Sequence, residues 1–335
     1  MITKLHIKNF KSIKDLKLNC SRVNIFIGEQ NTGKSNILEA LGLLSTINNP
    51  TKINAKNSIV DYVRAEDMTN LFYNKIIDNP ISVDLLSSLG HDILTINYLQ
   101  NEFEIICSDI KNNKKLIDVN VDKEIRNIRA PFYSNPQALP IRYYRFKEMK
   151  TFPSKEIDFL KPPYGSNLLK IIQTRKEVKE FVLDLFSKYG YKYQGFEDLN
   201  KIYFNLQFKG EFVPLPFHLL SDTLIRIIFY YAIIELNQDA AILLEEPESH
   251  IFPFYNKFLA EKISLFSNNQ FFIATHNPTF LVNLIEKTKD EDLTVFITKY
   301  NKSNYQTKLQ PLKGKNADKL LEYGNSLFMN LDRIR

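Results

Sequence analysis

Residues 28–36 read Gly-Glu-Gln-Asn-Thr-Gly-Lys-Ser-Asn and fit the pattern G-x-x-x-x-G-K-[ST] at Gly28, Gly33, Lys34 and Ser35. A short apolar run ends at Gly28, and a helical pattern with one apolar face begins at Lys34. The motif requires a strand, a glycine loop and a helix in this order. The sequence therefore predicts a phosphate-binding loop here.

The residue types of this loop explain its chemistry. Gly28 and Gly33 let the backbone fold tightly with its N–H groups toward a phosphate, and the following helix adds its positive end. The ammonium group of Lys34 reaches the β and γ phosphates, and the hydroxyl of Ser35 can ligate Mg²⁺. The alternative is a chance glycine-rich turn, and two motifs further along the chain argue against it.

Composition limits the class of protein. The chain has 335 residues, of which 44% are hydrophobic and 24% charged, so we expect a soluble chain with a sizeable core. Cys20 and Cys107 show no metal or redox spacing and are typical of reduced thiols. The N-terminus reads as an alternating strand, and no apolar run approaches the roughly 18 residues of a membrane span. We therefore expect a cytoplasmic protein without a membrane partner.

Periodicity predicts an α/β fold. The expected strands are residues 1–19 as a pair, then 23–27, 94–98, 103–106, 140–146, 202–208, 212–215, 240–244, 270–274, 293–298 and 307–309. The expected helices are residues 34–47, 168–188, 222–236, 254–265, 278–285 and 317–323. Alternation of strands and helices after residue 220 indicates a mainly parallel sheet. The strand before the phosphate loop, residues 23–27, comes from the other end of the chain. We therefore expect a head of residues 1–47 and 211–335 with residues 48–210 as an inserted lobe.

A second motif ends in two acids. Residues 240–244 form an apolar run that leads directly to Glu245 and Glu246. Ligand sites of open α/β sheets lie at the carboxyl edges of the strands. One carboxylate would orient the Mg²⁺ shell, and the next can polarise the water that attacks the γ-phosphate. The alternative is a strand that simply ends in acids at the surface.

A third motif ends in a histidine. Residues 270–274 are another apolar run, and Thr275-His276-Asn277-Pro278 follows it. A neutral imidazole at His276 could hydrogen-bond the γ-phosphate or the attacking water and so sense the γ-phosphate. A purely structural histidine is the alternative.

A fourth stretch, residues 219–226, precedes a long apolar helix. Ser221 or Asp222 could cap that helix. A helix N-terminus with free N–H groups is also an anion site.

Together the four stretches resemble the ABC-class ATPases of the RecF/SMC/OLD group, and most closely the small "AAA family" ATP-binding proteins related to OLD nucleases and RecF-like ATPases. The loop resembles the group's G-x-N-x-x-G-K-S-N pattern in its tail. Residues 245–253 resemble its EEPExHxxP stretch, and residues 275–278 its THSP stretch. The resemblance covers residues 1–45 and 214–300 well and implies a P-loop NTPase with an ABC-type ATPase head and an antiparallel β subdomain.

The resemblance also implies site residues. It assigns phosphate wrapping to the loop residues Asn31, Thr32, Gly33, Lys34, Ser35 and Asn36, with Ser35 on Mg²⁺. Glu245 stands where the group often has its metal-associated aspartate, Glu246 would be the catalytic base, and His276 the switch histidine. Ser221, Asp222 and Thr223 fall at the signature motif, which contacts the γ-phosphate bound to the other subunit. This signature lacks the usual glycine, and ATP at the interface of a homodimer is the implied assembly.

Two functions compete, while a third, the ATPase subunit of a membrane transporter, is disfavoured because the signature stretch lacks the expected glycines. The first is an ATPase whose heads close on ATP and act on DNA in repair, recombination or defence. Its supporting charge is modest, since the chain has a net charge of +6 and a solvated basic tail explains residues 299–335 equally well. The second is a regulatory switch subunit that holds or releases a protein effector such as a nuclease or toxin. The aromatic and basic residues at 142–147 could bind single strands, but a strand with one buried face explains them equally well.

Overall fold

The structure is a computed structural model that describes residues 1–47, 59–125, 128–129, 139–196, 201–209, 211–331 and 334. The chain divides into two compact units. The first contains residues 1–143, 239–246 and 267–335, and the second contains residues 144–238 and 247–266. The predicted division into a head and an inserted lobe at residues 48–210 is not tested by these units and stays a prediction.

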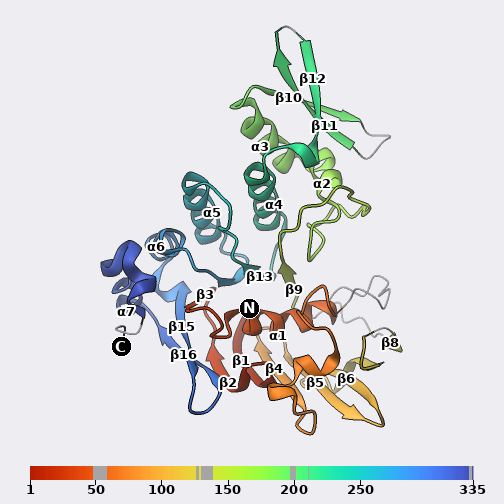
Figure 1. The fold of residues 1–335 in the computed structure, drawn as a ribbon, viewed down its shortest axis with the longest axis vertical. Coiled ribbons are helices and arrows are strands. Elements are labelled where there is room, and N and C mark those ends of the chain that lie inside the picture. The colour runs from red at the N-terminus through yellow and green to blue at the C-terminus, as the bar shows by residue number, and fades with distance from the viewer. Residues whose placement is uncertain are drawn as a thin grey trace. The chain divides into compact units, whose positions relative to one another are not determined.

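A six-stranded sheet is the centre of the first unit (Figure 1), in the order β16-β15-β3-β14-β13-β9. Its strands are β3 (Val23–Gly28), β9 (Ile141–Tyr144), β13 (Ala241–Glu245), β14 (Gln270–Ala274), β15 (Leu293–Asn301) and β16 (Gln306–Leu312). β15, β3, β14 and β13 are parallel, and β16 is antiparallel to β15. The prediction of a mainly parallel sheet built from both ends of the chain is confirmed.

Burial explains why these segments form parallel strands. Every residue of β3 and β14 is buried, and so are the first four of β13. Continuous apolar runs of this kind are typical of strands covered on both faces. The register aligns Glu245 with Ala274 and Ala274 with Phe26, so the carboxyl ends of β13, β14 and β3 meet at one edge.

A second, antiparallel sheet of seven strands has the order β2-β1-β4-β5-β6-β7-β8. Its strands are β1 (Ile2–Phe10), β2 (Ile13–Asn19), β4 (Ile81–Ser87), β5 (His91–Leu99), β6 (Glu102–Asp109), β7 (Lys114–Val121) and β8 (Ile128–Arg129). Alternate residues of β4 and β6 are buried, so one face covers the core. This is the expected antiparallel subdomain, but β4, β7 and β8 were not predicted.

Helix α1 (Lys34–Ile47) lies between the two sheets of the first unit and contacts β13, β14 and β1. Its apolar residues share one core cluster with Phe26 and with the inward residues of β1 and β2. The remaining elements of this unit are η1 (Met68–Leu71), η2 (Tyr73–Lys75), α6 (Pro278–Lys287), η5 (Asp290–Asp292), α7 (Lys315–Asp318) and η6 (Leu321–Met329). The helix predicted at residues 317–323 is wrong, because α7 ends at Asp318 and a 3₁₀ segment with non-helical Gly324 follows.

The second unit is mainly helical. It contains α2 (Leu168–Thr174), α3 (Lys176–Ser187), α4 (Asp222–Leu236) and α5 (Pro253–Leu265), with η4 (Phe217–Leu219) before α4. A three-stranded sheet has the order β10 (Tyr191–Phe196), β11 (Lys201–Phe208), β12 (Glu211–Pro216). The single helix predicted at residues 168–188 breaks at Arg175, whose φ of −92° and ψ of 112° are extended. Eleven residues of α4 are buried, so α4 is the core helix of this unit.

Two sequence-based alternatives can be decided from burial. Tyr143 and Tyr144 are both fully buried, so they do not form an exposed platform for stacking bases. The strand predicted at residues 140–146 is confirmed over the shorter range of β9, in which three of the four residues are buried. In the parts of the chain that the structure describes, no helix has the length and apolar character needed to span a bilayer.

Candidate active site at the carboxyl edge of the parallel sheet

The phosphate loop connects β3 to α1 and is closely backed by β15 and β16. Gly28 has φ +154°, and a Cβ there would lie 2.2 Å from Thr298 Oγ1 and 2.4 Å from its carbonyl oxygen. Gly33 has φ +97°, and a Cβ there would lie 2.2 Å from Thr307 Oγ1. Asn31 also adopts a left-handed conformation, with φ +59°. Both motif glycines are therefore required by close approach and by backbone conformation.

Threonine hydroxyls fix the loop from behind. Thr32 Oγ1 donates to the carbonyl oxygen of Glu29 at 2.9 Å and lies 2.6 Å from Thr298 Oγ1. Thr307 Oγ1 donates to the carbonyl oxygen of Thr32 at 3.0 Å. These bonds hold the turn in one conformation. The loop is therefore ordered when the chain folds, and ligand binding does not have to order it.

Lys34 lies inside the loop. Its side chain is almost wholly buried, and Nζ donates to the carbonyl oxygens of Gly28 at 2.9 Å and Glu29 at 2.6 Å. Burial lowers the pKa of Lys34 to about 8, and the nearby charges of Glu246 and Glu29 oppose that shift. Lys34 thus presents a partly desolvated cation within electrostatic reach of Glu246.

The start of α1 also contacts the turn between β1 and β2. Asn36 Nδ2 donates to Ser12 Oγ at 2.8 Å, and Ser12 Oγ lies 2.7 Å from Thr307 Oγ1. Ser35 occupies the turn of α1 between Lys34 and Asn36. The predicted loop residues are therefore brought together, with Ser12 as an additional neighbour.

The two predicted acids differ in their surroundings. Glu245 ends β13, where Oε1 accepts a hydrogen bond from Arg64 Nη2 at 2.8 Å and Oε2 accepts one from the Tyr143 hydroxyl at 2.9 Å. Glu246 follows in a left-handed conformation with φ +46°, and its N–H donates to the carbonyl oxygen of Ala274 at 2.8 Å. A left-handed conformation is costly for a residue other than glycine and often marks a functional position.

His276 is close to Glu246. Its Nε2 lies 3.6 Å from Glu246 Oε1. Burial lowers the pKa of His276, the charge of Lys34 lowers it further, and the charge of Glu246 opposes both effects. Because the ordinary pKa of histidine is about 6.5, the imidazole is mainly neutral at physiological pH. Glu246 and His276 therefore lie next to each other at this edge, and Lys34 interacts electrostatically with both, while the roles of all three stay predictions.

Sequence reasoning missed a charge network behind the site. Glu39 of α1 has a fully buried side chain that pairs with Lys11 and accepts a 2.8 Å bond from Arg64 Nε. Lys11 Nζ also donates to the carbonyl oxygen of Arg64 at 2.7 Å. Arg64 thus bridges Glu39 to Glu245. The available signal was Glu39 itself, an acid inside the apolar run of a predicted helix, which requires partners when buried.

The predicted signature residues lie in the second unit, at the start of α4. Ser221 occupies the N-cap position, but its side chain makes no capping hydrogen bond. Asp222 pairs with Arg226 at 2.7 Å, and Thr223 Oγ1 donates to the carbonyl oxygen of His250 at 3.0 Å. This last bond ties the start of α4 to the segment that leads into α5.

The donor set suits Mg²⁺ bound together with a phosphate. Ser35 and Glu245 offer oxygen atoms, which Mg²⁺ prefers, and Mg²⁺ commonly uses one or two carboxylates together with substrate phosphates and water. Among the described residues there is no cluster of three or more His, Cys, Asp or Glu side chains that could hold a metal. Ser35 and Glu245 are the residues that would hold the metal or its bound water.

Similar proteins support an ATPase. The chain is 24% identical over 366 residues to an ATP/GTP phosphatase of Helicobacter pylori, across 93% of this chain and 92% of that protein. A match of 54% identity over 44 residues to an uncharacterized protein of Methanocaldococcus jannaschii covers 13% of this chain and spans only 20% of the length of that relative.

Solved structures support the fold. The SmcHead bound to the C-winged helix domain of ScpA has a TM-score of 0.51 and 15% identity, covering 95% of this chain and 99% of that one. An Smc head domain with an extended coiled coil, bound to the C-terminal domain of ScpA derived from Pyrococcus furiosus, has a TM-score of 0.50 and 15% identity, covering 96% and 98%. At this identity the likeness concerns the fold alone, and it confirms the expected α/β fold of the SMC-head type.

The AAA ATPase domain family matches residues 1–213, which include the phosphate loop, α1 and the antiparallel sheet. Together with the phosphate loop and the SMC-like fold, this match confirms the predicted resemblance. The chain belongs to the AAA ATPase domain family and is an ATPase.

Proposed function

We propose that the chain binds Mg-ATP at the carboxyl edge of its parallel sheet, hydrolyses it with Glu246 and His276, and uses this cycle to close and open a homodimer linked to DNA repair, recombination or antiphage defence. The observation that carries the proposal is the approach of Lys34, Glu246 and His276 at one edge. A cation can hold a phosphate, while a carboxylate and a neutral imidazole can position the water that attacks it.

Phosphate binding would begin at the loop. Residues Asn31 to Ser35 would wrap the phosphates with their N–H groups, and Asn36 would hold the start of α1 against Ser12. Lys34 Nζ now donates to two loop carbonyl oxygens, so a short movement of the side chain would bring it to the β and γ phosphates. A phosphate would also compensate the burial that lowers the pKa of Lys34.

Hydrolysis would depend on Glu246 and His276. The 3.6 Å between Glu246 Oε1 and His276 Nε2 exceeds a direct hydrogen bond, so both groups can engage a water at the same place. Glu246 would accept a proton from that water and direct its lone pair. His276, being neutral, can donate one hydrogen bond to the γ-phosphate or to the attacking water.

Bound Mg²⁺ would neutralise phosphate charge. Ser35 would offer its hydroxyl to the metal. Both carboxylate oxygens of Glu245 already accept hydrogen bonds, from Arg64 and Tyr143. We therefore assign Glu245 to orienting metal-bound water, since direct ligation would have to displace one of these donors.

The second unit would supply the dimer contact. Three large apolar side chains near the start of α4 and the start of α5 are mostly exposed, namely Leu219 at 63%, Phe252 at 65% and Phe254 at 68%. The bond from Thr223 to the carbonyl oxygen of His250 connects these two segments. Exposed apolar groups beside a predicted signature motif favour a surface that a second copy covers. Ser221, Asp222 and Thr223 would then approach the nucleotide of that copy.

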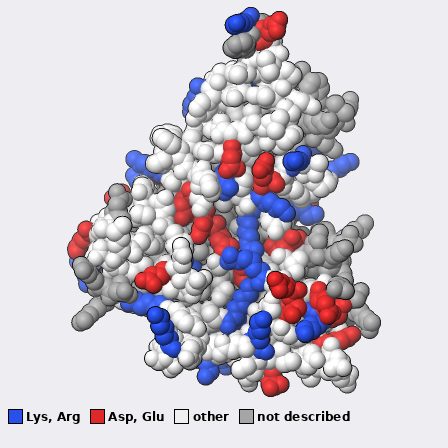
Figure 2. All heavy atoms as spheres, in the orientation of Figure 1, with Lys and Arg blue, Asp and Glu red and all other residues white. Residues whose placement is uncertain are grey.

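Charge supports a DNA partner only weakly. Figure 2 shows a band of Lys and Arg side chains on one face, with Asp and Glu side chains beside it. Mixed charge of this kind gives a smaller field for DNA than a single-sign surface would. The response of ATP turnover to duplex DNA distinguishes a DNA partner from a protein effector such as a nuclease or toxin.

The test is ATP turnover by the natural chain and by Glu246→Gln, each with and without duplex DNA. Glu286→Gln, which removes an exposed acid of α6, is the matched control. We expect Glu246→Gln to bind ATP, to lose turnover by about 100-fold or more, and to accumulate as a dimer in light scattering. Normal turnover by Glu246→Gln would overturn the catalytic assignment. Turnover that depends on Glu246 but ignores DNA would replace the DNA role with the switch subunit.

A further inference from the structure

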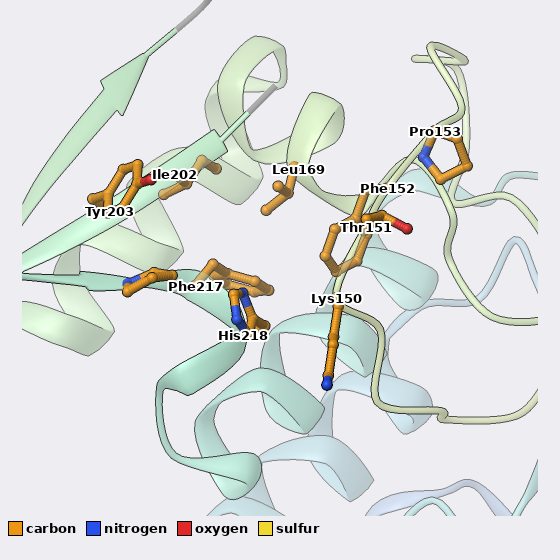
Figure 3. Close-up of a pocket in the computed structure, with 10 residues that line it drawn as sticks. Lys150, Thr151, Phe152, Pro153, Leu169, Ile202, Tyr203, Phe217 and His218 are labelled. Carbon is orange, nitrogen blue, oxygen red and sulfur yellow. The ribbon is translucent and has the colours of Figure 1, made fainter. Parts of the chain in front are cut away.

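A cavity of about 350 Å³ lies within the second unit, bounded by α2, by β11, by the end of β12 with η4, and by residues 150–153 (Figure 3). Its volume falls within the range of roughly 300–1,000 Å³ that is usual for small-molecule sites. None of its lining residues belongs to the nucleotide site described above.

The walls of the cavity are apolar and partly aromatic. Phe152, Leu169, Ile202 and Phe217 surround the space in Figure 3. The rings of Phe152 and Phe217 meet edge to face with centroids 6.0 Å apart. Such walls suit a flat apolar body, which would pack against the rings and so remove its apolar surface from water.

The polar lining is rich in hydrogen-bond donors. Lys150, Thr151, Tyr203 and His218 can all donate hydrogen bonds, and no Asp or Glu is among the described residues that line the cavity. In Figure 3 the side chains of Lys150 and His218 lie on the same side of the space. Lys150 is exposed at the edge of the space and His218 is half-buried, so an anionic group could pair with Lys150 there while an apolar body attached to it contacts the walls.

We propose that this cavity binds an organic anion with a flat apolar body, with the body against Phe152 and Phe217 and the acid group on Lys150 and His218. The location of the cavity connects it to the predicted signature motif. Phe217 and His218 belong to η4, which is followed directly by Leu220 and Ser221 at the start of α4. A bound anion would therefore contact the turn that leads into the predicted signature motif, although its binding does not depend on the proposed function.

The binding experiment uses two dyes that differ in one group. The probe is 8-anilinonaphthalene-1-sulfonate, and N-phenyl-1-naphthylamine is the matched dye without the sulfonate. We expect one sulfonate dye per chain in a fluorescence titration. Lys150→Met should lower the affinity for the sulfonate dye about tenfold, which is the effect of losing a charged hydrogen bond. The same change should alter the affinity for the neutral dye less than twofold. Lys155→Met removes an exposed lysine that does not line the cavity and should change neither.

Hydrogen exchange locates the bound dye. We expect slower exchange at residues 150–153, 202–203 and 216–218 when the sulfonate dye is saturating. The proposal would be overturned if Lys150→Met and Lys155→Met changed the affinity for the sulfonate dye equally, or if Lys150→Met weakened the binding of both dyes equally. Binding of several dyes per chain, or protection confined to other segments, would also overturn it.

Discussion

The phosphate loop and the start of α4 both present a helix N-terminus, but their side chains are satisfied very differently. At the loop, Thr32 bonds with Thr298 and Thr307, and Asn36 bonds with Ser12. At α4, by contrast, Ser221 makes no capping bond. The loop is shaped by its own chain before any ligand arrives, whereas the start of α4 has fewer internal supports.

This contrast suggests a division of work. A loop whose conformation is already fixed can bind a phosphate without further ordering, so nucleotide affinity should belong to the first unit. The exposed apolar side chains next to α4 suggest that this region depends on a surface from another molecule. Changes in the loop should therefore remove nucleotide binding, and changes at α4 should spare binding but impair turnover.

The largest expected effect is that of Lys34→Ala on nucleotide affinity. The ammonium group is the only side-chain cation that the motif directs to the phosphates, so its loss should weaken ATP binding by about 100-fold or more. The measurement is a titration with a fluorescent ATP analogue. Lys8→Ala, which removes an exposed lysine of β1, serves as the control. Nearly natural affinity in Lys34→Ala would mean that the loop does not hold the nucleotide.

A large effect on stability is expected from Glu39→Ala. This change leaves Lys11 and Arg64 without their buried partner, and breaking a buried ion pair typically costs about 3–5 kcal/mol. Urea unfolding would measure the loss. The control Glu66→Ala removes an exposed acid and should lower the free energy of unfolding by less than about 0.5 kcal/mol. Equal unfolding free energies for the two variants would show that the network behind Glu245 is not structural.

The sequence predicted the local part of the site and missed its distant supports. The loop, Glu245, Glu246 and His276 follow apolar strands directly, so their shared edge could be inferred from the order of strands and helices. Thr298, Thr307 and Arg64 reach the site only through sheet register and tertiary packing, and no local pattern points to them. The break at Arg175 has the same cause, because neither glycine nor proline marks it and the helical pattern continues across it.

A smaller effect is expected at α4. Thr223→Val removes the bond to the carbonyl oxygen of His250, and one such bond is worth about 1 kcal/mol, or about fivefold. We expect turnover of the otherwise natural chain, and dimer formation in the Glu246→Gln background, each to fall by about that factor while the ATP affinity of the monomer is unchanged. Thr223→Ser keeps the hydroxyl and should behave like the natural chain. If valine and serine have the same effect, the bond does not contribute to the contact.

The smallest effect is a pH dependence of ATP affinity that separates the loop from α4. Because the pKa of Lys34 is lowered to about 8 by burial, the ammonium is present at pH 7 and is lost as pH rises through 8. A bound phosphate favours the charged form and raises that pKa, so affinity should fall about twofold between pH 7 and pH 8 and continue to fall above it. Lys34→Arg keeps its charge at these pH values and should show no decrease, whereas Thr223→Val should show the natural profile. A flat profile in the natural chain, or a decrease in Lys34→Arg as steep as the natural one, would mean that another group controls affinity in this range.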